Sequence, residues 1–309
     1  MNQAPTPTAD AVRRLVRTLL ADDRAAGTGP DVRPVAESGE PATWWVGGRH
    51  VLRLAPDREA SARRRRELRL RDLVRPHIGI AVPASVAHGD WSAGLCYTLD
   101  TRLAGVTGEE QDVSALGEAD LAALLTGLRE VPVRQAEALG VPRVAPRSLE
   151  ALRTSAEQAA ARLAAADEFD PARLAQLTAA AAAQLGVQPG TAVLVHHGLS
   201  GEHLVVSADG RVRGVLDWTA ATVGDPTEDI AGLAAAVGAP AAVRAATLAG
   251  YGARPCLRGL WLSRCDTVIR LADRLRGRGD TPVALLRTRL RRAWEAILLE
   301  RVTELTDGD

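Results

Sequence analysis

The feature that most constrains this chain is the segment Thr191–Gly232, in which short apolar runs alternate with polar, glycine-containing loops. Its first apolar run, residues 193–195, predicts a buried strand leading into the loop His196–His203. Two further β-rich runs flank the turn Ser207–Gly210 and predict a hairpin. Asp217 closes the second strand. A polar loop and a carboxylate are thus expected side by side on rigid supports, as is typical of phosphate and metal sites.

This segment resembles the core of the aminoglycoside phosphotransferase and choline kinase-like family. That family has the pattern H-G-D-x-x-x-x-N, then a hairpin, then I-D-W, and finally G-D-P-x-x-D-L-A. His196, Asp217 with Trp218, and the block Gly224–Ala231 match it at the family's spacing. The resemblance extends over roughly residues 30–275. It implies an α+β, bilobal, protein-kinase-like fold, with a small antiparallel β-sheet lobe and a mostly helical lobe that carries the catalytic-loop hairpin.

Two positions depart from the family pattern. Gly198 stands where the family has the catalytic aspartate that receives the acceptor's proton. His203 stands where a metal-binding asparagine is usual, and the macrolide phosphotransferases of the family carry histidine there. In motif the chain is therefore nearest to that branch. His197 is a candidate replacement base, because imidazole titrates near neutral pH, although adjacent side chains in a loop point in different directions.

The resemblance also implies which residues form the site. The expected catalytic set is His196, His197, Gly198 and His203, with His196 in a position that mostly braces the loop in kinase folds. Asp217 and His203 are expected to hold a divalent cation, which the resemblance implies is Mg²⁺. A carboxylate suits that ion, whereas imidazole suits softer metals.

The first hundred residues predict a nucleotide-binding lobe. Short β-rich runs between residues 32 and 54 indicate antiparallel strands. By resemblance, Gly39 lies in the turn that covers the phosphates of ATP or GTP. Arg53 takes the position of the phosphate-binding lysine of protein kinases and is expected to pair with Glu67 of the next helix. An exposed strand cation is the alternative for Arg53. Thr98 precedes the expected interlobe hinge and is assigned to the same nucleotide site.

These patterns divide the chain into three parts. Residues 1–29 are expected to form a tail and a helix capped by Asp10, residues 30–101 the small lobe, and residues 102–309 the helical lobe. Proline breaks and alanine-rich runs predict the helices of the last part. They are expected at 118–130, 148–185, 241–248, 257–275 and 282–305.

Composition argues against several classes of partner. The 38 basic residues, all of them arginine, balance 38 acidic ones, so no overall field favours nucleic acid or a membrane. The run Arg63–Arg66 precedes an amphipathic helical pattern and is expected to solvate its outer face. Cys96, Cys256 and Cys265 fit neither a zinc pattern nor a disulfide framework. A signal peptide and a membrane-spanning run are also lacking, so we expect a cytoplasmic protein.

Three functions compete at this point. The first is a phosphotransferase that acts on an antibiotic or biosynthetic intermediate, weakened by Gly198. The second is a pseudokinase that binds a nucleotide, a natural product or a partner enzyme without turnover. The third is a kinase for serine or threonine of a biosynthetic precursor peptide. Asp266 and Asp273 are possible substrate-facing carboxylates, but an ordinary solvated helix face would look the same.

Overall fold

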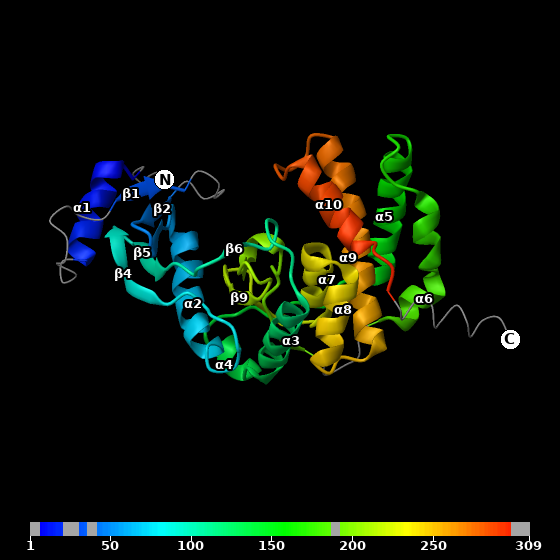
Figure 1. Ribbon diagram of the computed structural model, residues 1–309, viewed down its shortest axis with the longest axis horizontal. Helices are drawn as coiled ribbons and strands as arrows, with labels where there is room; N and C mark the ends of the chain where they lie inside the picture. Colours follow the sequence, from blue (N-terminus) through cyan, green and yellow to red (C-terminus); the bar gives the residue numbers. More distant parts are fainter. Residues whose placement is uncertain (1–6, 21–30, 36–41, 187–191, 298–309) are drawn as a thin grey trace.

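The chain forms two lobes that lie side by side (Figure 1). The computed structural model describes residues 7–20, 31–35, 42–186 and 192–297. One lobe holds an antiparallel sheet with α1 and α2, the other is mainly helical, and a small hairpin lies between them. The α+β class predicted from the sequence is therefore confirmed.

The small lobe is built on a five-stranded sheet of order β1-β2-β3-β5-β4. Every neighbouring pair is antiparallel, as predicted. Its strands are β1 (Val32–Pro34), β2 (Thr43–Val46), β3 (His50–Leu54), β4 (Ser85–Ser92) and β5 (Leu95–Thr101).

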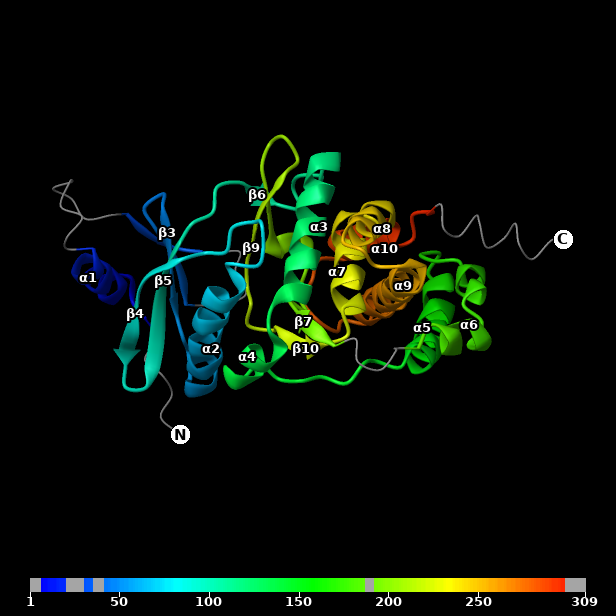
Figure 2. The same ribbon diagram turned by 90° about the horizontal axis from the view of Figure 1, so that it is seen from below.

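Helix α1 (Ala9–Leu19) covers the outer face of this sheet (Figure 2). It begins after Thr8, whose hydroxyl accepts a hydrogen bond from the backbone N–H of Ala11 at 3.3 Å. The prediction that Asp10 caps this helix was therefore wrong. Asp10 instead lies in the first turn, where its negative charge interacts favourably with the helix dipole. Two buried valines, Val12 and Val16, pack against the sheet.

Helix α2 (Arg58–Val74) covers the opposite face of the sheet. The Ser61 hydroxyl accepts a hydrogen bond from the backbone N–H of Cys96 at 3.1 Å, which ties the helix to β5. Arg53 lies opposite Thr98 in the register of β3 and β5. Side chains of paired residues point to the same face, so both belong to the α2 side of the sheet.

The arginine run within α2 is only partly solvated. Arg63 and Arg65 are exposed, as predicted, but Arg64 is buried. Arg66 reaches the large lobe, where its Nη2 donates to the backbone carbonyl of Thr219 at 2.9 Å. The prediction that all four arginines form an outer face was wrong, because Arg64 shares the buried face of α2 with Glu67 and Arg71, three and seven residues later, while Arg66 reaches the other lobe.

The large lobe is predominantly helical. Its helices are α3 (Ala115–Glu130), α4 (Val133–Ala138), α5 (Leu149–Ala164), α6 (Ala179–Gln184), α7 (Thr227–Val237), α8 (Ala239–Leu248), α9 (Ala253–Leu275) and α10 (Val283–Ala293).

Two predicted helices in this lobe are shorter than expected. The pattern 148–185 is interrupted after α5, where Asp167 has a φ of 55° and a 3-10 turn occupies Pro171–Gln176. α10 ends at Ala293, whereas the predicted helix continues to residue 305. Residues 298–305 lie outside the described part of the chain. Alanine-rich composition favours helix in both places, but it cannot show where tertiary packing ends one.

The predicted hairpin is formed by β8 (Leu204–Val206) and β9 (Val212–Val215). The turn between them contains Gly210 at a φ of 74°, a conformation that suits glycine. β6 (Val106–Thr107) extends this pair to three strands, and β7 (Val193–Val195) pairs separately with β10 (Thr222–Gly224). Asp217 lies two residues beyond the end of β9 rather than within it.

Apolar packing against α3 holds the hairpin in place. Three buried hairpin side chains belong to the same core cluster as the α3 leucines: Leu204, Val206 and Val215 from the hairpin, with Leu121, Leu124 and Leu125 from α3. Among the described residues, no helix combines the length and apolarity needed to cross a membrane. The chain leaves the small sheet at Thr101, and the proposed division at residues 29 and 101 stays a prediction.

Candidate functional site

His196 braces the loop that follows β7. Its side chain is completely buried, its Nε2 lies 3.0 Å from the backbone carbonyl of Leu216, and its ring meets Trp218 edge-on at 4.7 Å. Burial lowers the pKa of His196 to about 3, so the ring is neutral at physiological pH. A buried, neutral imidazole hydrogen-bonded to the backbone positions the loop and is poorly suited to receive a proton from a substrate.

Asp229 holds the same loop from the opposite side. Its two carboxylate oxygens accept hydrogen bonds from the backbone N–H groups of His196 and His197, at 2.8 and 2.9 Å. Burial raises the pKa of Asp229 to about 7 against these two bonds, which lower it. The sequence placed Asp229 within the matching block Gly224–Ala231 but gave it no role. That motif position was the signal that could have identified it.

The next two residues of the loop are less buried than His196. His197 is exposed and has a φ of 62°, which is uncommon for a residue with a side chain. Gly198 does not have positive φ, and a Cβ added there would lie 3.6 Å from the nearest side-chain atoms. The space beside Gly198 therefore admits a side chain, and the unusual backbone belongs to His197.

His203 joins the loop to the carboxylate of Asp217. Its Nδ1 lies 2.6 Å from the carbonyl oxygen of Gly198, and its Nε2 lies 3.6 Å from Asp217 Oδ2. Because a carbonyl oxygen only accepts, Nδ1 carries a hydrogen, and Nε2 is the ring nitrogen that could bind a cation once it has lost its own hydrogen. Nε2 and the Asp217 carboxylate face each other.

Asp217 is held in an ionised state with one oxygen available. Its Oδ1 accepts hydrogen bonds from the backbone N–H of Thr219 at 3.1 Å and from its hydroxyl at 2.5 Å. Burial alone would raise the pKa of Asp217, but the Thr219 hydroxyl and the nearby charges of His203 and Arg53 bring it below its ordinary value. The backbone at Asp217 has a φ of 55°, and strain of this kind clusters at functional sites.

These two side chains fit a divalent cation, although they do not complete its coordination shell. Asp217 Oδ2 and His203 Nε2 lie 3.6 Å apart, so one oxygen and one nitrogen are close enough to bind the same ion. Within the described ranges, no group of three or more His, Cys, Asp or Glu residues could hold a metal ion. A nucleotide-bound cation takes most of its remaining ligands from phosphate and water, so a two-residue site suits that role.

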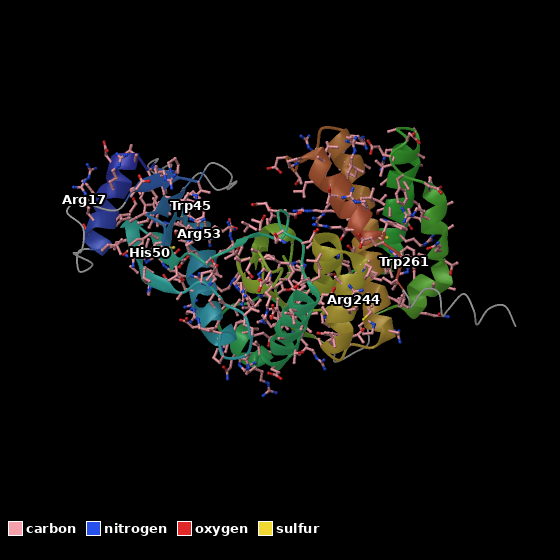
Figure 3. The ribbon with its side chains drawn as sticks, in the orientation of Figure 1. Arg17, Trp45, His50, Arg53, Arg244 and Trp261 are labelled. Carbon is pink, nitrogen blue, oxygen red and sulfur yellow. The ribbon has the colours of Figure 1, made fainter. Side chains whose placement is uncertain are left out.

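In the small lobe, Glu67 contacts Arg71 instead of the expected Arg53. Arg71 Nε lies 3.9 Å from Glu67 Oε1, and both side chains are buried. Neither carboxylate oxygen of Glu67 accepts a hydrogen bond in the part of the chain that the structure describes. The predicted Arg53–Glu67 pair is therefore corrected. Arg53 lies on β3 (Figure 3), within electrostatic range of Asp217 in the other lobe.

The other two residues predicted to bind the nucleotide are Thr98 and Gly39. Thr98 is fully buried, and its hydroxyl donates to Asp100 Oδ2 at 3.1 Å. Asp100 in turn accepts a hydrogen bond from Arg71 Nη2 at 3.1 Å. Thr98 thus belongs to the buried polar network between β5 and α2. Gly39 lies outside the described residues.

A cavity of about 280 Å³ opens beside the loop. His197 and Gly198 line one wall, and most of the rest of the lining comes from Arg147 and from residues of α7, α9 and α10, including Asp266 of α9. Asp273, the other predicted carboxylate, is not part of this lining and pairs with Arg278 at 3.3 Å. The loop therefore adjoins this cavity and also carries His203, which faces Asp217.

The comparison with protein families decides the ancestry of this site. Residues 31–260 match the model of the phosphotransferase enzyme family. The chain belongs to this family. Among curated proteins, a match with the uncharacterized protein YcbJ of Bacillus subtilis (strain 168) is 46% identical over 41 residues. It spans only 13% of the length of each protein.

Solved structures agree with the kinase-like fold. The GDP complex of aminoglycoside 2'-phosphotransferase-IIIa superimposes with a TM-score of 0.63 at 19% identity, covering 91% of this chain and 98% of that one. The macrolide 2'-phosphotransferase MphH of Brachybacterium faecium gives 0.57 at 22% identity, covering 92% and 99%. At such identities the likeness establishes the bilobal fold of this phosphotransferase-family protein and leaves its substrate open.

Proposed function

We propose that this family member binds a purine nucleotide and a small hydroxylated natural product, and that its phosphoryl transfer is weakened by Gly198. One contrast carries the proposal. His203 Nε2 and Asp217 Oδ2 converge 3.6 Å apart as cation ligands, while Gly198 in the same loop has no group to accept a proton. Aminoglycoside phosphotransferase structures with this fold include a GDP complex, a complex with GDP and kanamycin, and a ternary complex with streptomycin and ATP.

The nucleotide half of the proposed site comprises residues from both lobes. Arg53 would contact phosphate, with Glu67 and Thr98 in the polar layer behind it, and His203 and Asp217 would hold Mg²⁺ or a softer divalent ion. When bound, such an ion supplies neutralisation of the nucleotide's phosphate charge. Either ATP or GTP is compatible with these residues.

The acceptor half must orient a hydroxyl group and remove its proton. Gly198 can do neither, and general-base assistance is worth roughly 10²- to 10⁴-fold. The exposed ring of His197 lines the same cavity and is the nearest candidate for that role. Transfer without a carboxylate base would be slow, and we expect little or no measurable kinase activity from the unmodified protein.

A second candidate function is binding without turnover. It is favoured by Gly198 and by the contact of Glu67 with Arg71, which leaves the usual cation–glutamate pair of an active kinase unformed. Such a pseudokinase would bind a natural product, a precursor peptide or a partner enzyme.

Thermal unfolding with ATP or GTP, each with and without Mg²⁺ or Mn²⁺, tests the proposal. We expect a metal-dependent rise in unfolding temperature that Asp217→Ala removes and Asp273→Ala retains. Asp273 is a suitable control, because it is an aspartate of α9 outside the cavity lining. Without any response to either nucleotide at millimolar concentration, the protein is a ligand- or partner-binding scaffold and the nucleotide proposal fails.

A further inference from the structure

Both carboxylates that line the cavity beside Gly198, Glu228 and Asp266, are paired with one arginine. Arg147 Nη1 donates to both oxygens of Asp266 at 2.9 Å, while its Nε and Nη2 donate to Glu228 at 2.9 and 2.6 Å. Burial works to lower the pKa of Arg147, but these bonds raise it above its ordinary value. One arginine therefore occupies two carboxylates with four hydrogen bonds, and a cationic ligand would have to displace it.

A second arginine of the cavity lining is also paired with carboxylates. Arg289 is 9% exposed, and its Nη2 lies 2.8 Å from Glu109 Oε1 and 3.6 Å from Glu202 Oε1. Arg289 lines the cavity, whereas Glu109 and Glu202 do not. Here the acidic groups lie outside the lining and Arg289 is the charged side chain presented to the cavity, whereas Glu228 and Asp266 belong to the lining and are held by Arg147.

Two hydrogen-bond donors in the lining have no partner among the described residues. Arg270 is exposed and takes part in no hydrogen bond or ion pair there, so its guanidinium is available to a ligand. The hydroxyl of Ser263 is buried and forms no hydrogen bond in the same part of the chain. A buried hydroxyl without a partner costs stability unless a ligand or water satisfies it.

We propose that this cavity binds a hydroxylated acceptor carrying an anionic group, such as a carboxylate, and selects against polycations. Arg270 would bind the anion through its planar fork, Ser263 would bind a polar atom of the ligand, and the hydroxyl would lie at His197 and Gly198. This inference rests on the proposed function in one respect, because it takes the cavity to be the acceptor site. It extends that function by naming the charge of the substrate.

A matched series of sugars tests the selection by charge. D-Glucuronate, D-glucose and D-glucosamine share a hydroxylated ring and carry a negative, zero and positive charge at neutral pH. Their binding to the full chain is measured by ligand-observed NMR without nucleotide, with kanamycin as the polycationic probe. We expect glucuronate to bind most tightly and glucosamine and kanamycin most weakly.

Two variants connect the preference to named side chains. Arg270→Gln is expected to weaken glucuronate binding roughly tenfold, the scale of one charge-assisted hydrogen bond, and to leave glucose unchanged. Arg276→Gln is the matched control, since Arg276 is an exposed arginine at the end of α9 outside the cavity lining. Arg147→Gln frees Glu228 and Asp266, and we expect it to increase binding of glucosamine and kanamycin.

The proposal is overturned if glucosamine or kanamycin binds the parent better than glucuronate. It is also overturned if glucuronate does not bind at millimolar concentration, or if Arg270→Gln and Arg276→Gln behave alike. If Arg147→Gln does not fold, the comparison of Arg270→Gln with Arg276→Gln decides the test alone. Because these measurements omit nucleotide, sugar binding can fail while the nucleotide-dependent thermal shift succeeds. Sugar binding can also succeed while the thermal shift fails, so the failures of the two proposals are distinguishable.

Discussion

The two sides of the loop His196–His203 differ in how far they conform to phosphotransferase chemistry. On one side, His203 Nε2 and Asp217 Oδ2 face each other at 3.6 Å. On the other side, Gly198 stands where the sequence resemblance places the catalytic base, beside a cavity whose carboxylates are bound to Arg147. The loop itself is well held, since Asp229 accepts hydrogen bonds from the backbone of two of its residues.

This difference indicates that the two parts of the proposed site can change separately. The proposed cation side depends on a histidine fixed by the carbonyl of Gly198, an interaction that needs only backbone at that position. The proposed acceptor side depends on the side chain that a glycine lacks. In this account, a substitution at residue 198 removes the base and retains the backbone contact that fixes His203.

Gly198→Asp is the change with the largest expected effect. If the cation side is functional, restoring the carboxylate should raise transfer by roughly 10²-fold, the lower end of general-base effects. The added Cβ meets nothing closer than 3.6 Å, so the variant is expected to fold. Phosphoryl transfer is measured with ATP and GTP, using water, macrolides, aminoglycosides and the anionic sugar as acceptors.

A fast parent that Gly198→Asp leaves unchanged would show that another base is present. In that case His197→Ala should abolish turnover, because His197 is the titratable residue next to Gly198 on the cavity wall. If neither protein transfers phosphate to any acceptor, the chain is a binder.

The pH dependence of stability should reveal the buried groups of the loop. The pKa of His196 is about 3 in the folded state, below its ordinary value, so acidification protonates the unfolded chain first. Between about pH 6 and pH 4 this removes about 1.4 kcal/mol of unfolding free energy per pH unit. His196→Gln lacks that loss, and denaturant unfolding of both proteins over this range measures the difference.

Protonation of Asp229 changes the unfolding free energy in the opposite direction. Its pKa of about 7 lies above its ordinary value, so the folded chain binds a proton first and gains stability as the pH falls from about 7 to 4. Asp229→Asn should therefore lose more stability on acidification than the parent does. Equal pH slopes in the parent and both variants would contradict the burial assigned to these two groups.

His203→Asn tests the identity of the cation. Imidazole favours Mn²⁺ over Mg²⁺ relative to an oxygen ligand, so the variant should shift the Mn²⁺-to-Mg²⁺ preference of nucleotide binding roughly tenfold towards Mg²⁺. Thermal shift with each metal measures this preference, with His88→Asn, an exposed histidine of β4, as the control. An unchanged preference would remove His203 from the metal site.

The smallest effect concerns the contact between the lobes. Arg66→Ala removes the hydrogen bond to the Thr219 carbonyl and should cost about 1 kcal/mol of unfolding free energy. Arg63→Ala removes only an exposed pair with Glu59 and should cost less than about 0.5 kcal/mol. Equal costs would show that Arg66 contributes no more than a surface residue.

Much of this could be predicted from the sequence, because the decisive signals are local. The Asp-Gly turn, the alternating apolar runs and the motif spacing between His196 and Asp217 all lie within one segment, and they specified the hairpin. The predicted cap at Asp10 failed by two residues, since Thr8 and Asp10 are both good capping residues.

What could not be predicted depends on contacts between distant residues. The pairing of Arg147 with Glu228 joins positions 81 residues apart, and nothing in the local sequence indicates it. Arg71 lies one helical turn from Glu67 on the same face of α2, and that proximity prevails over the family pairing with Arg53. The tautomer of His203 likewise depends on a carbonyl that only the folded loop brings near.

The nucleotide dissociation constants of the parent and of Gly198→Asp, measured by calorimetry with Mn²⁺ or Mg²⁺, test the central claim most directly. If the cation side is intact and separate from the acceptor side, both proteins bind ATP or GTP with dissociation constants that agree within about twofold, a difference of less than about 0.5 kcal/mol. A parent that binds neither nucleotide, while Gly198→Asp binds one, would contradict the account.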